Sequence, residues 1–158
     1  MTAPDDTLER LYAAFVRKDG EAMAGCYAPD ATFDDPVFGL QGRDVGDMWR
    51  MLTERGKDTL SVEYRIVDDA HADWTADYVF EGHPVHNEIR SAFEFGADGR
   101  ITKQVDTFDF PKWAGQALGW KGKLLGRTGF LHNAVRKTSA GTLRAWQRRR
   151  APGAADGG

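Results

Sequence analysis

Residues 27 to 49, YAPDATFDDPVFGLQGRDVGDMW, decide the fold. Ala31, Phe33 and Asp35 occupy alternate positions, which predicts a short strand that carries these three side chains on one face. The end of the stretch opens a predicted helix over Arg43 to Glu54, because its apolar residues recur at helical spacing. The carboxyl group of Asp35 is therefore expected to share a face with apolar side chains.

Two further helices precede this stretch. Apolar residues at i, i+3, i+4 and i+7 predict a helix over Thr7 to Lys18 that buries one stripe. Asp19-Gly20 ends this helix, and a short helix over Glu21 to Tyr27 follows it. The members of the buried stripe are Leu8, Leu11, Tyr12 and Phe15.

Strands are predicted from Leu60 onward, where the period of the apolar residues changes to two. This alternation indicates strands over Val62 to Ile66, Trp74 to Phe80 and His86 to Phe95, and residues 96–99 predict a hairpin turn. The last strand, over residues 100–110, is ambiguous. Its pattern allows two sets of inward residues: Ile101 with Val105, or Gln104 with Asp106, Phe108 and Phe110.

Together these elements predict an α+β fold. Four strands joined by tight turns form an antiparallel meander, and the three N-terminal helices must cover its apolar face. A long, twisted sheet that curls around the helices gives a cone-shaped barrel, with the helices on its concave face and a cavity between the layers. We expect one domain over residues 1–110, a basic helical extension over 111–150 and a disordered tail over 151–158.

Charge is distributed unevenly between these regions. Residues 1–110 carry 11 Lys and Arg against 23 Asp and Glu, whereas residues 111–150 carry 10 Lys and Arg and no acidic residue. Three interpretations of the basic extension stay open: docking over the pocket on the acidic body, contact with an anionic membrane surface, and binding of nucleic acid. The acidic body favours docking, which would bury Trp113 and Trp120, and it argues against nucleic acid.

Composition and motifs exclude several functional classes. The single cysteine, Cys26, rules out an internal disulfide and a cysteine-based metal cluster. No apolar run reaches the roughly 18 residues of a membrane span, and no secretory signal is expected at the N-terminus, so a cytoplasmic protein is predicted. A glycine-rich nucleotide motif is absent, and His83 and His86 lack a third ligand nearby, so no metal or other cofactor is expected.

The stretch over residues 27–49 resembles the nuclear transport factor 2-like superfamily, whose members include ketosteroid isomerases, SnoaL-like polyketide cyclases and scytalone dehydratases. The resemblance covers roughly residues 7–110 and is supported by the sequences of residues 30–33 and 98–101. It implies a cone-shaped fold with a pocket for a small hydrophobic molecule, and a homodimer through the sheet. It does not define an activity, because this fold hosts enzymes and non-enzymes alike.

The resemblance to the isomerases makes Asp35 and Tyr12 catalytic candidates. Asp35 aligns with the general-base carboxylate, and an apolar environment would raise its pKa toward neutrality. Tyr12 aligns with the tyrosine that donates to the oxyanion, and a buried tyrosine hydroxyl needs a partner. Each residue also has a structural interpretation: Asp35 as a cap of the turn into Pro36, and Tyr12 as part of the core.

The second acid of the isomerases has no direct counterpart. Its position in the oxyanion hole aligns with Ser91, a weaker donor, which argues against steroid isomerisation by the same machinery. Asp106 is an alternative acid if the last strand turns it inward, and it is solvated if Val105 faces inward instead. The further residues expected to bind the ligand are Trp49, Tyr78, Asn87, Ser91, Phe93 and Phe108.

The sequence therefore predicts binding of a small hydrophobic metabolite, with acid–base chemistry of isomerase, cyclase or dehydratase type by Asp35, Tyr12 and Asp106. The alternative is a non-catalytic module that binds a ligand or partner and whose basic tail contacts a membrane surface. Two inward carboxylates would favour the enzyme. A pocket filled by the protein's own side chains would favour the module.

Overall fold

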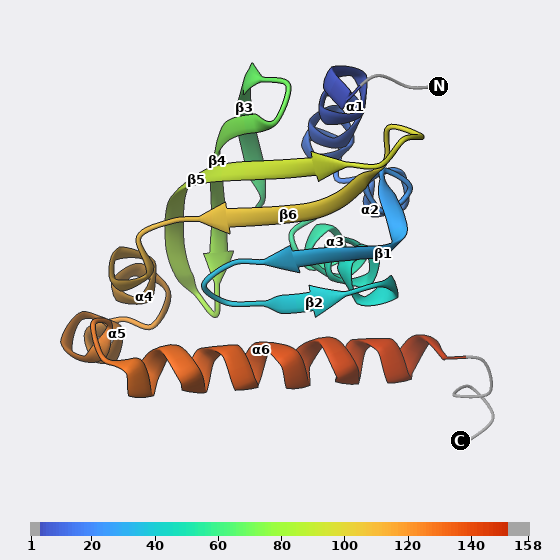
Figure 1. The fold of residues 1–158 in the computed structure, drawn as a ribbon. Coiled ribbons are helices and arrows are strands. Elements are labelled where there is room, and N and C mark those ends of the chain that lie inside the picture. The colour runs from blue at the N-terminus through green and yellow to red at the C-terminus, as the bar shows by residue number, and fades with distance from the viewer. Residues whose placement is uncertain (1–3, 152–158) are drawn as a thin grey trace.

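In a computed structural model of the protein, residues 4–151 are described. In the described residues, two helices, two strands and a third helix come first, four strands follow, and three helices end the chain (Figure 1). In chain order the elements are α1 Pro4–Val16, α2 Gly20–Ala24, β1 Tyr27–Asp34, β2 Gly39–Gln41, α3 Arg43–Arg55, β3 Ser61–Asp68, β4 His71–Phe80, β5 His83–Phe95, β6 Ile101–Thr107, α4 Phe110–Ala117, α5 Trp120–Leu125 and α6 Gly129–Arg150.

The six strands form one curved, unclosed sheet in the order β2-β1-β6-β5-β4-β3, with α1 and α3 on its concave side (Figure 1). The predicted α+β class and the antiparallel meander of β3 to β6 are confirmed. Two features were not predicted: β1 pairs in parallel with β6, and β2 adds an edge strand beside β1. The three residues of β2 are too few, and too exposed, to show an apolar alternation.

Aromatic side chains from the helices and the sheet fill the interior of the cone. Phe15 on α1 contacts both Trp49 on α3 and Trp74 on β4, with ring centroids 5.1 Å apart in each pair. Phe33 on β1 lies edge-on to Trp49 at 5.7 Å. Such edge-to-face arrangements are favoured by the ring quadrupoles. The apolar stripe of α1 is buried in the same core, as the helical spacing of its residues predicts.

The ambiguity of the last strand is resolved by an irregularity in β6. Ile101, Gln104 and Asp106 are all buried, so inward residues come from both of the predicted sets. The register against β5 shifts between Glu94 and Phe95, and an extra residue at such a bulge moves the following side chains to the other face. Asp106 thus faces the interior, and Val105 is only partly buried.

The basic extension packs on the body in two places. Helix α4 lies against β5, where Trp113, Phe110 and Val85 form a second small core, and α5 follows it. The expectation that docking buries both tryptophans is met by Trp113 but is wrong for Trp120, whose side chain is 70% exposed. Short helices were expected throughout, yet residues 129–150 form one continuous helix.

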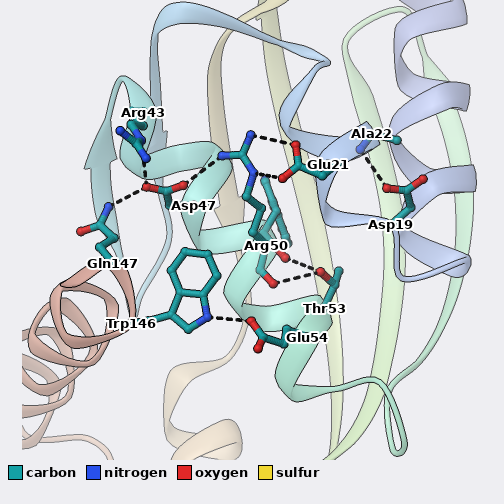
Figure 2. A network of polar contacts seen from close by, with 11 residues as sticks. Asp19, Glu21, Ala22, Arg43, Asp47, Arg50, Thr53, Glu54, Trp146 and Gln147 are labelled. Carbon is teal, nitrogen blue, oxygen red and sulfur yellow. Dashed lines mark hydrogen bonds and ion pairs between the residues drawn. The ribbon is translucent and has the colours of Figure 1, made fainter. Parts of the chain in front are cut away.

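Helix α6 is held on α3 by apolar and polar contacts (Figure 2). Trp146 is buried in the main core and donates from Nε1 to Glu54 Oε2 at 2.8 Å. Gln147 Nε2 donates to carboxylates of Asp44 at 2.7 Å and Asp47 at 2.9 Å. An extension rich in cations and amides therefore docks on acidic groups of the body. Of the end predicted to be disordered, residues 152–158 lie outside the described residues.

Candidate functional site

A buried polar network centres on Asp106 of β6. Ser91 on β5 lies directly opposite Asp106, and its hydroxyl donates to Asp106 Oδ1 at 2.5 Å. Gln104 Nε2 donates to the same oxygen at 2.9 Å, and Trp74 Nε1 donates to Ser91 Oγ at 2.8 Å. The Oδ1 atom is therefore saturated, whereas Oδ2 accepts no hydrogen bond from any residue between 4 and 151.

A second arm of the network reaches Asp106 through Gln104. Trp49 Nε1 donates to the Tyr27 hydroxyl at 2.8 Å, and that hydroxyl donates to Gln104 Oε1 at 2.5 Å. Sequence reasoning did not include Tyr27, because it stands at the predicted end of a helix rather than on a strand face. The network fixes the orientation of the Gln104 amide, since its oxygen must accept from Tyr27 and its nitrogen donate to Asp106.

Burial raises the pKa of Asp106 to about 7. The hydrogen bonds from Ser91 and Gln104 lower it in part, and the nearby Asp35 carboxylate raises it further. A proton on this acid belongs on Oδ2, because Oδ1 already accepts two hydrogen bonds. Near neutral pH, Asp106 is thus partly protonated, and the protonated form can donate from Oδ2.

The hydroxyl of Tyr12 is the second unusual group of the interior. It is fully buried and forms no hydrogen bond with acceptable geometry among the described residues, although it lies near Ser91 and Asp106. Burial and the Asp106 charge hold the pKa of Tyr12 well above its usual 10, so the hydroxyl keeps its proton. An unsatisfied buried hydroxyl costs free energy, and such a cost in a native fold points to a functional use.

Asp35 lies just beyond the end of β1, in the turn to β2. Its Oδ1 accepts hydrogen bonds from the amides of Val37 and Phe38, both at 2.6 Å, so it caps the turn as its structural interpretation expects. Burial nevertheless raises the pKa of Asp35 to about 6, against the lowering effects of these two amides and of Arg136. The group is a carboxylate at neutral pH, with one oxygen committed to the turn.

The remaining predicted ligand-binding residues fall into an inner and an outer group. Phe93 packs edge-on against Tyr12 at 6.4 Å, and Tyr12 contacts Trp74. Trp74 in turn contacts Trp49 and donates to Ser91. Tyr78 and Phe108 lie nearer Asp35 and contact Trp113 of α4, whose Nε1 donates to the Tyr78 hydroxyl at 2.7 Å. Asn87 is buried on β5, and its amide side chain bonds to no described residue.

Two hollows of about 510 and 530 Å³ open on the outside, one on the outer face of the sheet and one between α1 and α2. Neither is lined by Tyr12, Asp35 or Asp106. The internal pocket therefore stays a prediction, and helix α4 covers the outer group of its expected lining.

The histidines do not form a metal site in the described part of the chain. No group of three or more His, Cys, Asp and Glu there could hold an ion. His86 is exposed, and its Nδ1 is hydrogen-bonded to Asp77 Oδ1 at 2.7 Å. This contact raises the pKa of His86.

The chain belongs to the SnoaL-like domain family, whose model matches residues 8–104. No curated protein matches its sequence. Among solved structures, it is similar to an LEH-like epoxide hydrolase from M. tuberculosis, at 20% identity and a TM-score of 0.56, covering 78% of this chain and 93% of that one. It is also similar to a protein assigned as a polyketide cyclase from Silicibacter sp., at 20% identity and a TM-score of 0.57, covering 72% and 94%.

A third similar structure is the epoxide hydrolase/cyclase-like enzyme SalBIII of pyran ring formation in salinomycin. It is 14% identical with a TM-score of 0.56, and the match covers 66% of this chain and 89% of that one. At such identities these likenesses establish the fold. The match to the SnoaL-like family model places the chain in the nuclear transport factor 2-like superfamily, in agreement with the resemblance of residues 27–49.

The raised pKa of Asp106 predicts a pH-dependent stability. Its folded-state pKa, about 7, exceeds the usual 3.8, so the folded protein holds a proton that the unfolded chain releases. The stabilisation from this bound proton is complete when the pH is below the unfolded-state pKa, and it is lost as the pH rises through the folded-state pKa. Asp106→Asn keeps the acceptor oxygen and cannot ionise, so we expect it to be about 2 to 4 kcal/mol more stable than wild type at pH 8.

Urea unfolding of both proteins at pH 5 and pH 8 measures this difference. Asp30→Asn is the matched control, because Asp30 is exposed on the same sheet, and we expect it to follow wild type at both values. If Asp106→Asn were less stable than wild type at pH 8, Asp106 would be an ordinary ionised carboxylate in the folded protein.

Proposed function

We propose that the interior of the cone binds a small, largely apolar molecule and moves a proton on it with Asp35 as base and Asp106 as acid. The observation that carries this proposal is that the half-buried Asp35 and the buried Asp106 act on each other electrostatically and both have raised pKa values, about 6 and about 7. Environments that separate the pKa values of neighbouring acids assign their roles. Between these values Asp35 accepts a proton while Asp106 holds one.

The proposed ligand presents an oxygen to Asp106 and Tyr12. The Oδ2 proton of Asp106 has no described partner, the Tyr12 hydroxyl has only a poorly aligned contact with Ser91, and the two groups lie near one another. Two such donors in a dry site stabilise negative charge that develops on a carbonyl or ether oxygen. Ser91 aligns with the acid of the isomerases but carries no acid itself. In this proposal it instead holds the neutral acid Asp106, which lies opposite it on the neighbouring strand.

The chemistry that this arrangement supports is of isomerase, cyclase or dehydratase type. Trp49, Phe93 and Phe108 offer apolar surface, and the unbonded amide of Asn87 and the Tyr78 hydroxyl offer specific polar contacts. The epoxide hydrolase and cyclase among the similar structures support a small organic substrate. General acid–base chemistry needs no cofactor, so none is proposed.

Access to the site is proposed to run beneath α4. This helix lies over Tyr78 and Phe108, and Gln116 clamps it by accepting from the His86 amide at 2.7 Å and donating to the His86 carbonyl at 3.1 Å. Residues 1–110 would then form the binding domain and 111–150 its cover. We also propose a cytoplasmic protein that forms a homodimer through the outer face of the sheet. No described helix is long and apolar enough to cross a membrane.

The second candidate is a module without catalysis, which binds a ligand or partner. It is favoured by the close filling of the cone by Phe15, Trp49 and Trp74, and by the position of both hollows outside it. In that case the polar network around Asp106 would serve to specify the packing of the core.

Mass spectrometry of small molecules that copurify with the protein tests the proposal. We expect an apolar compound with a carbonyl or ether oxygen, retained by wild type and by the control Asp30→Asn. Asp106→Leu, which removes the donor and fills its space, should lose it, with folding checked by circular dichroism. A compound retained equally by Asp106→Leu would show that the cone is not the binding site.

A further inference from the structure

The three most exposed large apolar side chains of the described chain lie within residues 120–130. Trp120 is 70% exposed, Leu124 72% and Phe130 79%, whereas the next, Val16 and Val79, are each 48% exposed. Trp120 and Leu124 are four residues apart on α5 and so share one face. We call this region, α5 and the start of α6, the α5–α6 corner. A cluster of exposed aromatic and aliphatic side chains marks an interaction site.

Unpaired cations surround the same side chains. Lys121, Lys123 and Arg127 form no ion pair with any described residue, and Lys121 Nζ lies 5.7 Å from the Trp120 ring centroid. Further along α6, by contrast, Arg136 pairs with Asp34 and Arg150 pairs with Glu54. Among the described residues, Arg136 and Arg150 are the α6 cations that form ion pairs, so the corner is distinguished by unpaired cations that lie beside exposed apolar side chains.

We propose that the α5–α6 corner docks on the surface of an anionic lipid bilayer. Tryptophan and phenylalanine are suited to the boundary between headgroups and acyl chains, and the neighbouring cations are attracted to acidic lipids. The absence of any Asp or Glu from residues 111–150 fits a negative partner. A bilayer needs no hollow on the protein, and neither of the two described hollows is lined by residues of the corner.

This surface is separate from the proposed active site but adjoins its cover. Helix α5 packs on α4, and the Cβ that a side chain at Gly122 would add falls 1.8 Å from the Ala114 carbonyl oxygen, so the two helices are in close contact. Docking through the corner would bring α4 to the bilayer, where apolar molecules are concentrated. That last consequence alone rests on the proposed function.

Vesicle cosedimentation of the full chain tests the proposal. The vesicles are phosphatidylcholine alone, or phosphatidylcholine mixed with phosphatidylglycerol, at low and high salt. We expect binding to the anionic vesicles that weakens with salt, and a blue shift of tryptophan fluorescence from Trp120, since the other four tryptophans are already buried. Trp120→Phe should keep most of the binding and lose the blue shift.

Two variants with matched controls locate the surface. Trp120→Ser/Leu124→Ser/Phe130→Ser should bind at least tenfold more weakly, whereas Val67→Ser/Val79→Ser, which alters exposed apolar residues of the sheet, should bind as wild type. Lys121→Glu/Lys123→Glu should lose more binding than Arg148→Glu/Arg149→Glu, which makes the same change of charge at the other end of the extension.

The proposal fails under three results. In the first, the wild-type protein does not bind anionic vesicles. In the second, each variant and its control lose vesicle binding to the same extent. The third is a wild-type dimer, seen by sedimentation velocity, that the triple serine variant converts to monomer while vesicle binding is unchanged. That result would assign the corner to a second copy of the chain. None of these measurements depends on turnover, so they test the membrane proposal independently of the proposed function.

Discussion

Asp35→Asn is expected to lower turnover of the substrate by about 10² to 10⁴-fold, the usual contribution of a general base. Asparagine has the same shape, and its side-chain oxygen can still accept from the amides of Val37 and Phe38, so the turn persists. What is lost is the proton acceptor. The rate of the wild-type protein and the variant would be measured on the molecule identified by copurification, across the pH range 5 to 8.

Asp34→Asn is the matched control for this change. Asp34 is the preceding residue, is exposed and pairs with Arg136, so it carries the same charge without facing the cone. Its variant should retain wild-type turnover. Undiminished turnover by Asp35→Asn would show that the base lies elsewhere, and an equal loss in both variants would indicate an effect of charge or of α6 docking.

Trp146→Ala is expected to lower the free energy of unfolding by about 3 to 5 kcal/mol, as for other large-to-small changes in a core. Trp146 belongs to α6 but is buried in the main core, and its Nε1 donates to Glu54 (Figure 2). The variant leaves a cavity between α6 and α3 and removes the partner of a carboxylate. Urea unfolding monitored by circular dichroism measures the difference.

Trp120→Ala serves as the control, because the same substitution at a side chain that is 70% exposed removes little buried surface. We expect it to change the free energy of unfolding by less than about 0.5 kcal/mol. Equal stability of Trp146→Ala and wild type would mean that the basic extension is not docked on the body in solution.

Much of the fold could be predicted because single elements carry complete patterns. Leu8, Leu11, Tyr12 and Phe15 recur at helical spacing, and they are the buried stripe of α1. The alternation between Trp74 and Phe95, with a tight turn after it, is sufficient for a meander. These signals are local, so one sequence is enough to detect them.

The features that could not be predicted depend on contacts between distant segments. The inward orientation of Asp106 depends on a bulge in the pairing of β5 with β6, and the sequence of β6 alone does not predict this bulge. Tyr27 joins the site only because β1 pairs in parallel with β6. The glycines of the extension predict breaks between short helices, yet α6 continues through Gly141. That residue faces open space, so its only effect is a lower helix propensity, which does not end the helix.

A carbon-13 NMR titration of the aspartate carboxyl groups measures the proposed acid and base directly, with Asp35→Asn and Asp106→Asn used to assign the two resonances. We expect pKa values of about 6 for Asp35 and about 7 for Asp106. We also expect Asp35→Asn to lower the pKa of Asp106, because a charge that raises it has been removed. Values for both groups at or below the model figure of about 3.9 would contradict the proposal that the cone holds an acid and a base.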